Sequence, residues 1–110
     1  MDQEIHLRVL RHLEQNPEVT QRELAEHLDV SLGKANYCLK ALISRGFVKA
    51  RNFKNSNHKS AYLYMLTPQG IDEKARISVA FLKRKMHEYE QLKQEIMQLE
   101  QEVNSKERAN

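Results

Sequence analysis

Seven cationic side chains occupy a stretch of this chain that contains no carboxylate. Between Asp29 and Asp72 the lysines and arginines are Lys34, Lys40, Arg45, Lys49, Arg51, Lys54 and Lys59. Ammonium and guanidinium groups bind phosphate oxygens, and one-sided charge of this kind steers a polyanion to one face of a protein. The pattern favours a nucleic acid as the partner. The alternative is a surface that is merely solvated or that binds another polyanion.

The flanking segments have a different charge balance. Residues 1–29 hold three basic and seven acidic residues, and residues 72–110 hold eight of each. The whole chain therefore carries only +3, although its middle stands at +7 between an acidic and a neutral flank. The distribution of charge is more informative than its total.

Composition excludes several classes of protein. No apolar run approaches the ~20 residues that span a bilayer, and the N-terminus lacks a signal peptide, so we expect a cytoplasmic protein with no membrane partner. Cys38 is the only cysteine, which excludes an internal disulfide and leaves a small buried hydrophobe or a redox-sensing thiol. A core made from 110 residues is marginal, so dimerisation is expected to supply part of the stability.

Neither a metal site nor a catalytic site is indicated. The five histidines are scattered, and the one pair at a suggestive spacing, His6 and His12, falls on different faces of one helix. No Ser/His/Asp or Cys/His arrangement and no phosphate loop is present. The sequence predicts no metal, no cofactor and no enzyme activity.

Three helices are predicted before residue 46. Apolar residues at helical spacing predict the first over residues 2–15. A capping box, Thr20 with Glu23, begins a second that ends near Asp29. Ser31 is the N-cap of a third, which runs to residue 45 before Gly46 ends it. Two helices joined by so tight a turn form a helix-turn-helix.

The third helix has two contrasting faces. At ~100° per residue, one arc is apolar and is predicted to face the core: Leu32, Ala35, Cys38, Leu39, Leu42 and Ile43. The other arc offers donors, an amide, a phenol and a glycine, groups that can meet phosphates and base edges. Its members are Gly33, Lys34, Asn36, Tyr37, Lys40 and Ser44.

A β-hairpin with a polar, basic tip follows the third helix. Residues 47–53 and 61–66 are rich in strand-forming side chains, and the loop between them is too long for a two-residue turn. Such a hairpin is the wing of a winged helix. The predicted fold class is therefore mainly α with a small β-hairpin wing (α+β), a winged helix-turn-helix over residues 1–67.

Thr67 and Pro68 predict the start of a long helix over 68–104, followed by a frayed tail at 105–110. Its apolar positions follow a heptad and predict a coiled-coil-like dimer interface, interrupted by Lys85. The interface residues are Leu82, Tyr89, Leu92, Ile96, Leu99 and Val103. The alternative is a helix folded back on its own domain, and the pairing direction of two such helices stays open.

Two stretches of the chain resemble the MarR superfamily of bacterial winged-helix regulators: TQRELAEHLDVSLGKANYCLKALISRGFVKA and YMLTPQG. More narrowly, the sequence resembles the short members associated with exopolysaccharide biosynthesis loci. The resemblance implies a homodimer that binds a palindromic operator in double-stranded DNA, with helix 31–45 in the major groove and wing 47–66 on the backbone or in the minor groove.

Carried over by position, the residues expected to contact DNA are Ser31, Leu32, Gly33, Lys34, Asn36, Tyr37, Lys40, Arg51, Lys54, His58 and Lys59. The wing departs from the family in lacking its aspartate-and-arginine pattern. One long C-terminal helix also replaces the interlocked helices that frame the usual effector pocket, so a small-molecule effector stays open.

These patterns predict a sequence-specific transcriptional regulator, with occlusion of a promoter as its expected action; whether it represses or activates does not follow from these residues. The rival interpretation is a winged-helix adaptor that contacts proteins, with a coiled-coil arm and no DNA binding. Acidic groups on the outward arc of the third helix would have favoured the adaptor, and that arc contains none.

Overall fold

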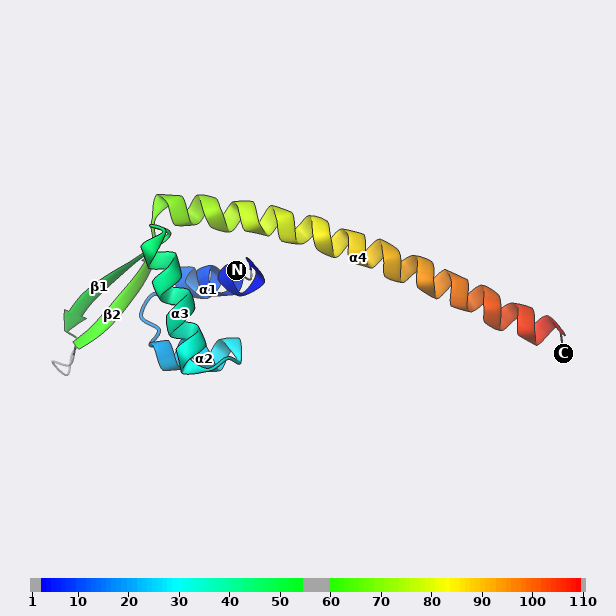
Figure 1. The fold of residues 1–110 in the computed structure, drawn as a ribbon, viewed down its shortest axis with the longest axis horizontal. Helices are drawn as coiled ribbons and strands as arrows, with labels where there is room; N and C mark the ends of the chain where they lie inside the picture. The colour runs from blue at the N-terminus through cyan, green and yellow to red at the C-terminus, as the bar shows by residue number, and fades with distance from the viewer. Residues whose placement is uncertain (1–2, 55–59, 110) are drawn as a thin grey trace. The chain divides into compact units, whose positions relative to one another are not determined.

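The computed structural model describes residues 3–54 and 60–109, in the order of three helices, two strands and a last helix (Figure 1). The helices are α1 (Gln3–Gln15), α2 (Gln21–Leu28), α3 (Leu32–Ser44) and α4 (Pro68–Ala109), and the strands are β1 (Val48–Lys54) and β2 (Ser60–Leu66). The strands pair antiparallel as one hairpin. This is the predicted winged helix-turn-helix with a long C-terminal helix.

The chain divides into two compact units, Met1–Ser78 and Val79–Asn110. The core of the first unit is built mainly from leucines on α1, α2 and α3, which are almost fully buried because each helix has one apolar stripe. The largest of these buried side chains are Leu7, Val9, Leu10, Leu13, Leu24, Leu28, Leu39 and Leu42.

The helix ends lie where local chemistry predicts them. Thr20 Oγ1 accepts from the Glu23 N–H at 3.1 Å, and Ser31 Oγ accepts from the Lys34 N–H at 3.0 Å. The Glu23 carboxylate differs from the predicted capping box, because it accepts from the Thr20 hydroxyl at 3.0 Å. Asp29 ends α2 with φ 56°, in the left-handed region, so the N-cap of α3, Ser31, can follow two residues later.

Thr67 and Gly70 fasten the start of α4 to the start of the hairpin. The Thr67 N–H donates to the Phe47 carbonyl at 3.1 Å, and Thr67 Oγ1 accepts from the Gly70 N–H at 3.0 Å. A Cβ on Gly70 would lie only 1.9 Å from the Phe47 carbonyl oxygen. The predicted N-cap is confirmed, and the close approach of helix and strand requires a glycine at residue 70.

The first unit extends further along α4 than the predicted boundary between residues 67 and 68. Ile77 is buried in the first unit, 2% exposed, and Lys74 Nζ lies 2.8 Å from Glu14 Oε1 of α1. The first turns of α4 therefore belong to the winged unit, which ends at Ser78.

The second unit consists of the remainder of α4. The helix continues through residues 105–109, which we expected to be frayed. Its large apolar side chains other than the more buried Phe81 are about half exposed, from 47% at Ile96 to 64% at Tyr89. Lys85, at a heptad core position, forms an ion pair with Glu88 one turn later, with Nζ 3.3 Å from Oε2.

We predict that Gly70→Ala destabilises the protein by about 2 kcal/mol, because its Cβ would overlap a backbone carbonyl that cannot rotate away. The matched control is Gly33→Ala, where the nearest atom to the added Cβ is 3.9 Å away. Urea unfolding followed by circular dichroism compares the two midpoints. Equal midpoints would show that the Phe47 carbonyl does not constrain residue 70.

Candidate nucleic-acid interface

The outward face of α3 is centred on a row of residues at helical spacing. Gly33, Tyr37, Lys40 and Ser44 are all exposed, and they recur at intervals of four, three and four residues. Tyr37 is 63% exposed, an unusual position for a tyrosine in water. Lys34 lies beside this row and is also exposed. A phenol and two ammonium groups thus project from one face with no carboxylate on the same helix.

Other predicted α3 residues lie at the margins of that face. Asn36 is half-buried, so its amide lies beside the row. Leu32 and Ile43 were predicted to face the core, but they are 45% and 36% exposed. The buried arc is narrower than predicted and consists of Ala35, Cys38, Leu39 and Leu42. Ser44 was outside the predicted site, although its spacing from Lys40 extends the exposed row.

The wing places its cations on two different faces. Because side chains alternate along a strand, Lys49 and Arg51 point to one face of the hairpin and Lys54 to the other. All three are exposed. The residues expected from the sequence to contact DNA included Arg51 and Lys54 but not Lys49. The two-residue periodicity of a strand, counted from Arg51, could have identified Lys49. His58 and Lys59, also in that set, lie outside the described residues.

Tyr64 connects the wing to the helix-turn-helix. Its backbone N–H donates to the Pro17 carbonyl at 2.9 Å, and its hydroxyl accepts from Gln21 Nε2 at 3.3 Å. Tyr64 is buried, 5% exposed, and its ring stacks on that of Tyr62 with centroids 6.1 Å apart. These contacts join β2 to the segment that begins α2. The wing is therefore fixed in position relative to the helix pair α2–α3.

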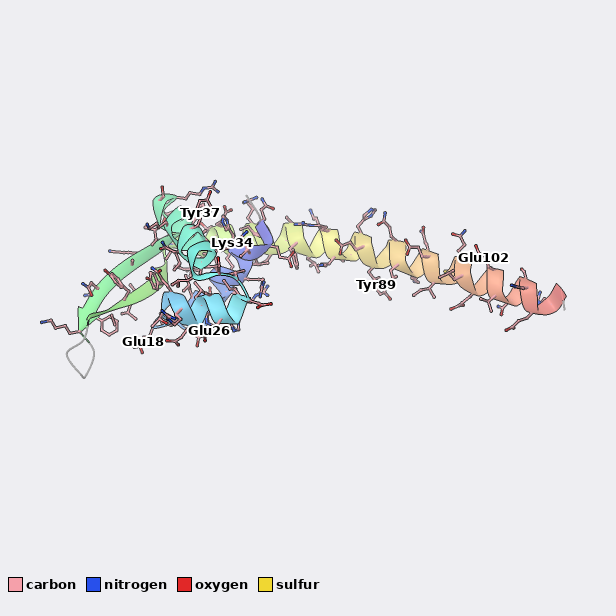
Figure 2. All side chains as sticks on the ribbon, turned by 60° about the horizontal axis from the view of Figure 1, so that its bottom comes forward. Glu18, Glu26, Lys34, Tyr37, Tyr89 and Glu102 are labelled. Atoms are coloured by element: carbon pink, nitrogen blue, oxygen red, sulfur yellow. The ribbon has the colours of Figure 1, made fainter. Side chains whose placement is uncertain are left out.

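Two acidic residues of the first unit lie away from the exposed face of α3. Glu18 and Glu26 lie on the α2 side, whereas Lys34 and Tyr37 lie along α3 (Figure 2). Arg45, at the C-cap of α3, differs from the other cations of the window, since its charge acts on Glu73 of α4. The hydrogen bond from Arg76, together with the charges of Arg76 and Arg45, lowers the pKa of Glu73 against the opposing effect of burial.

His12 of α1 and His27 of α2 stack with ring centroids 4.0 Å apart, at an interplanar angle of 30°. Burial and then the charge of His27 lower the pKa of His12 below its usual value, and Glu23 opposes this shift. The sequence placed these residues on separate helices without indicating their contact.

Within residues 3–54 and 60–109, there is no cluster of three or more His, Cys, Asp or Glu side chains that could hold a metal ion.

No helix in the described part of the chain is long and apolar enough to cross a membrane.

A family model described as winged helix-turn-helix DNA-binding matches residues 2–49, which include α1, α2, α3 and the first residues of the wing. The chain carries a winged helix-turn-helix DNA-binding domain. No curated protein matches the sequence.

Solved structures of transcriptional regulators share the fold. The PcaV regulator of Streptomyces coelicolor, solved with its natural ligand, is 20% identical with a TM-score of 0.61, over 72% of this chain and 55% of that chain. A PadR-like regulator of Bacillus cereus is 17% identical with a TM-score of 0.72, over 80% and 90%. The MarR family protein Rv2887 of Mycobacterium tuberculosis, solved with salicylic acid, is 24% identical with a TM-score of 0.59, over 74% and 59%.

At these identities the likeness shows a shared fold. This chain spans less than two thirds of the length of PcaV and of Rv2887. A shared fold says nothing about single side chains, so the residues on the outward face of α3 have to be judged by their own chemistry.

The His12–His27 pair predicts that the DNA-binding domain loses stability in mild acid. The folded pKa of His12 lies below the unfolded value of about 6.5, so the unfolded state binds more protons as the pH falls through that value. Stability from this group is complete above about pH 7 and declines below it. Melting temperatures at pH 7.5 and 5.0 should differ less in His12→Gln than in the native protein.

His87→Gln is the matched control, because His87 is exposed on α4 in the second unit. The control should keep the full pH dependence of the native protein. Identical pH dependence in both variants would contradict a role for the stacked pair.

Proposed function

We propose that this protein is a sequence-specific transcriptional repressor that binds a palindromic operator as a homodimer. In the proposed complex α3 enters the major groove and the wing lies on the backbone or in the minor groove. The protein is further proposed to belong to the MarR family and to its short exopolysaccharide-associated type, which rests on the sequence resemblance. Access to a bacterial chromosome then requires a cytoplasmic location.

The acid-free outward face of α3 is the observation that carries this proposal. In a helix-turn-helix, the second helix of the pair is the one that reaches base edges. Here that helix offers the Tyr37 hydroxyl and the Lys40 ammonium at its centre, with Lys34 beside them. An ordinary solvated helix would mix acidic and basic residues there, because opposite charges one turn apart stabilise each other.

The wing complements this face with charge. Lys49, Arg51 and Lys54 are distributed over both faces of the hairpin, so a hairpin lying along a groove would have cations toward both of its walls. Contacts of this kind neutralise phosphates without reading bases, and they fix the register of the protein on the duplex. Affinity would therefore come largely from the wing and sequence preference from α3.

The exposed apolar residues of the second unit support a homodimer. The predicted interface residues of α4 are all exposed in the isolated chain, including Leu82 at 59% and Leu99 at 58%. A stripe of large apolar side chains on one helix favours burial against a partner helix. The pairing of Lys85 with Glu88 reduces the cost of a charged residue at a core position of the heptad.

A two-fold dimer would place two copies of α3 on two half-sites about one turn of DNA apart. Occupancy of such a site within a promoter excludes RNA polymerase. The mechanism assigns no catalytic step and no cofactor to the chain. A small-molecule effector stays open.

We predict that Lys54→Ala weakens binding to operator and random duplexes by a similar factor, whereas Tyr37→Ala reduces mainly the preference for the operator. The reason is that a wing cation meets phosphates, while a residue at the centre of the α3 face meets base edges. Fluorescence anisotropy across a salt series measures both. The native dimer should show a slope of log K against log [salt] of about −4 to −8.

Equal losses on the two duplexes for both variants would contradict the assignment of separate roles. Glu26→Gln is the control, since Glu26 lies on the α2 side of the unit, and its affinity should change little. Failure of the native protein to bind either duplex at low salt would favour the adaptor function instead.

We predict that Ile96→Lys yields monomers, because it places a charge in the centre of the apolar stripe. Gln94→Lys is the matched control, since residue 94 has the f position of the preceding heptad, away from the stripe. Light scattering should give twice the chain mass for the native protein and the control. A dimeric Ile96→Lys variant would remove α4 from the proposed interface.

A further inference from the structure

Gly33 is the one glycine of the chain for which the fold supplies no reason. Gly46 has φ +79°, which disfavours a side chain, and a Cβ at Gly70 would lie 1.9 Å from the Phe47 carbonyl oxygen. A Cβ at Gly33 would have only Ser31 Oγ within 4 Å, at 3.9 Å, which is an ordinary contact. Its φ is outside the left-handed region. Any small side chain would therefore fit the isolated protein.

Glycine is unfavourable at such a position. It is a poor helix former, because its backbone loses the most conformational freedom on folding and because it leaves the helix backbone open to water. Alanine at residue 33 would satisfy the same geometry and would stabilise α3. A residue that costs stability with no benefit inside the fold suggests a requirement outside it.

The position of Gly33 identifies that requirement. Gly33 is the first residue of the exposed row on α3, one turn before Tyr37 and two turns before Lys40. It follows the N-cap Ser31 and precedes Lys34, whose N–H donates to the Ser31 hydroxyl. The absent side chain leaves the backbone of the first turn of α3 uncovered, beside groups suited to phosphates and base edges.

We propose that Gly33 is the point of closest approach between α3 and DNA, where a strand of the duplex packs directly on the helix backbone. This inference rests on the proposed DNA-binding function and assigns a positioning role to Gly33. The absence of a Cβ lets the first turn of α3 sit deep in the groove. That depth sets the distance at which Tyr37 and Lys40 reach the bases and phosphates.

Two properties of the protein should then respond in opposite directions to Gly33→Ala. The added methyl group raises the melting temperature by several °C through better helix formation. The same methyl group holds the duplex away from α3, and we expect operator affinity to fall at least tenfold. Gly33→Leu should weaken binding further, since a larger side chain separates helix and DNA more.

The experiment measures melting temperature and operator binding for the native protein, Gly33→Ala and Gly33→Leu. Weaker binding by a Gly33→Ala protein that is at least as stable as the native one supports the inference. Unchanged affinity overturns it. Loss of affinity accompanied by an equal loss of stability also overturns it, because the glycine would then serve the fold.

Gly70→Ala serves as the reference for a glycine required by the fold. Its melting temperature should fall, but at a low temperature where the variant is still folded it should keep its affinity for the operator. DNA binding by the native protein distinguishes a failure of the proposed function from a failure of the inference about Gly33. If native protein binds no DNA, the proposed function fails. If native protein binds and Gly33→Ala binds equally well, only the close approach at Gly33 fails.

Discussion

The burial of one narrow stripe of α3 determines how the rest of the DNA-binding domain can work. Ala35, Cys38, Leu39 and Leu42 are almost completely buried in the first unit, and this fixes the rotation of the helix about its own axis. A rotation of one residue, ~100°, would turn the row of Gly33 and Tyr37 toward the side of the unit. The hydrophobic effect thereby decides which polar groups are presented to a ligand.

A few contacts connect the hairpin and α4 to the segment just after α3 and to α2. The Phe47 carbonyl lies just after α3, and it accepts from Thr67 and lies against Gly70. The end of β2 and the start of α4 therefore lie close in space to the segment that joins α3 to β1. Tyr64 makes the second attachment, from β2 to Pro17 and Gln21 before and within α2.

Features that depend on near neighbours in the chain could be predicted from the sequence. The caps formed by Thr20, Ser31 and Thr67 involve partners three residues away, so residue type and spacing identify them. Features that depend on distant residues could not. The stacking of His12 on His27 and the extent of the first unit along α4 to Ser78 require knowledge of which helices pack together.

The candidate site shows the same division. Helical spacing predicted Gly33, Tyr37 and Lys40 on the outward face, and the structure places them there. Ile43 was predicted to face the core, because its angular position on the helix lies close to the buried residues. How much of the circumference of α3 is buried depends on the neighbouring helices, which helical spacing alone does not give. Arg51 and Lys54 lie on opposite faces of the hairpin because side chains alternate along β1. The sequence prediction grouped the two residues together without using this alternation.

Within the first unit, Glu18 and Glu26 lie on the α2 side and Lys34 lies along α3, so the separation of these three charges contributes an electric dipole. A dipole in the field of a polyanion experiences a torque as well as an attraction. In the proposed complex, this torque would turn the α3 side of the unit toward the duplex before the two surfaces touch. Salt limits the range of this alignment to about 8 Å under physiological conditions. Glu18 and Glu26, which lie outside the proposed contact, would thus increase the fraction of encounters that begin in the correct orientation.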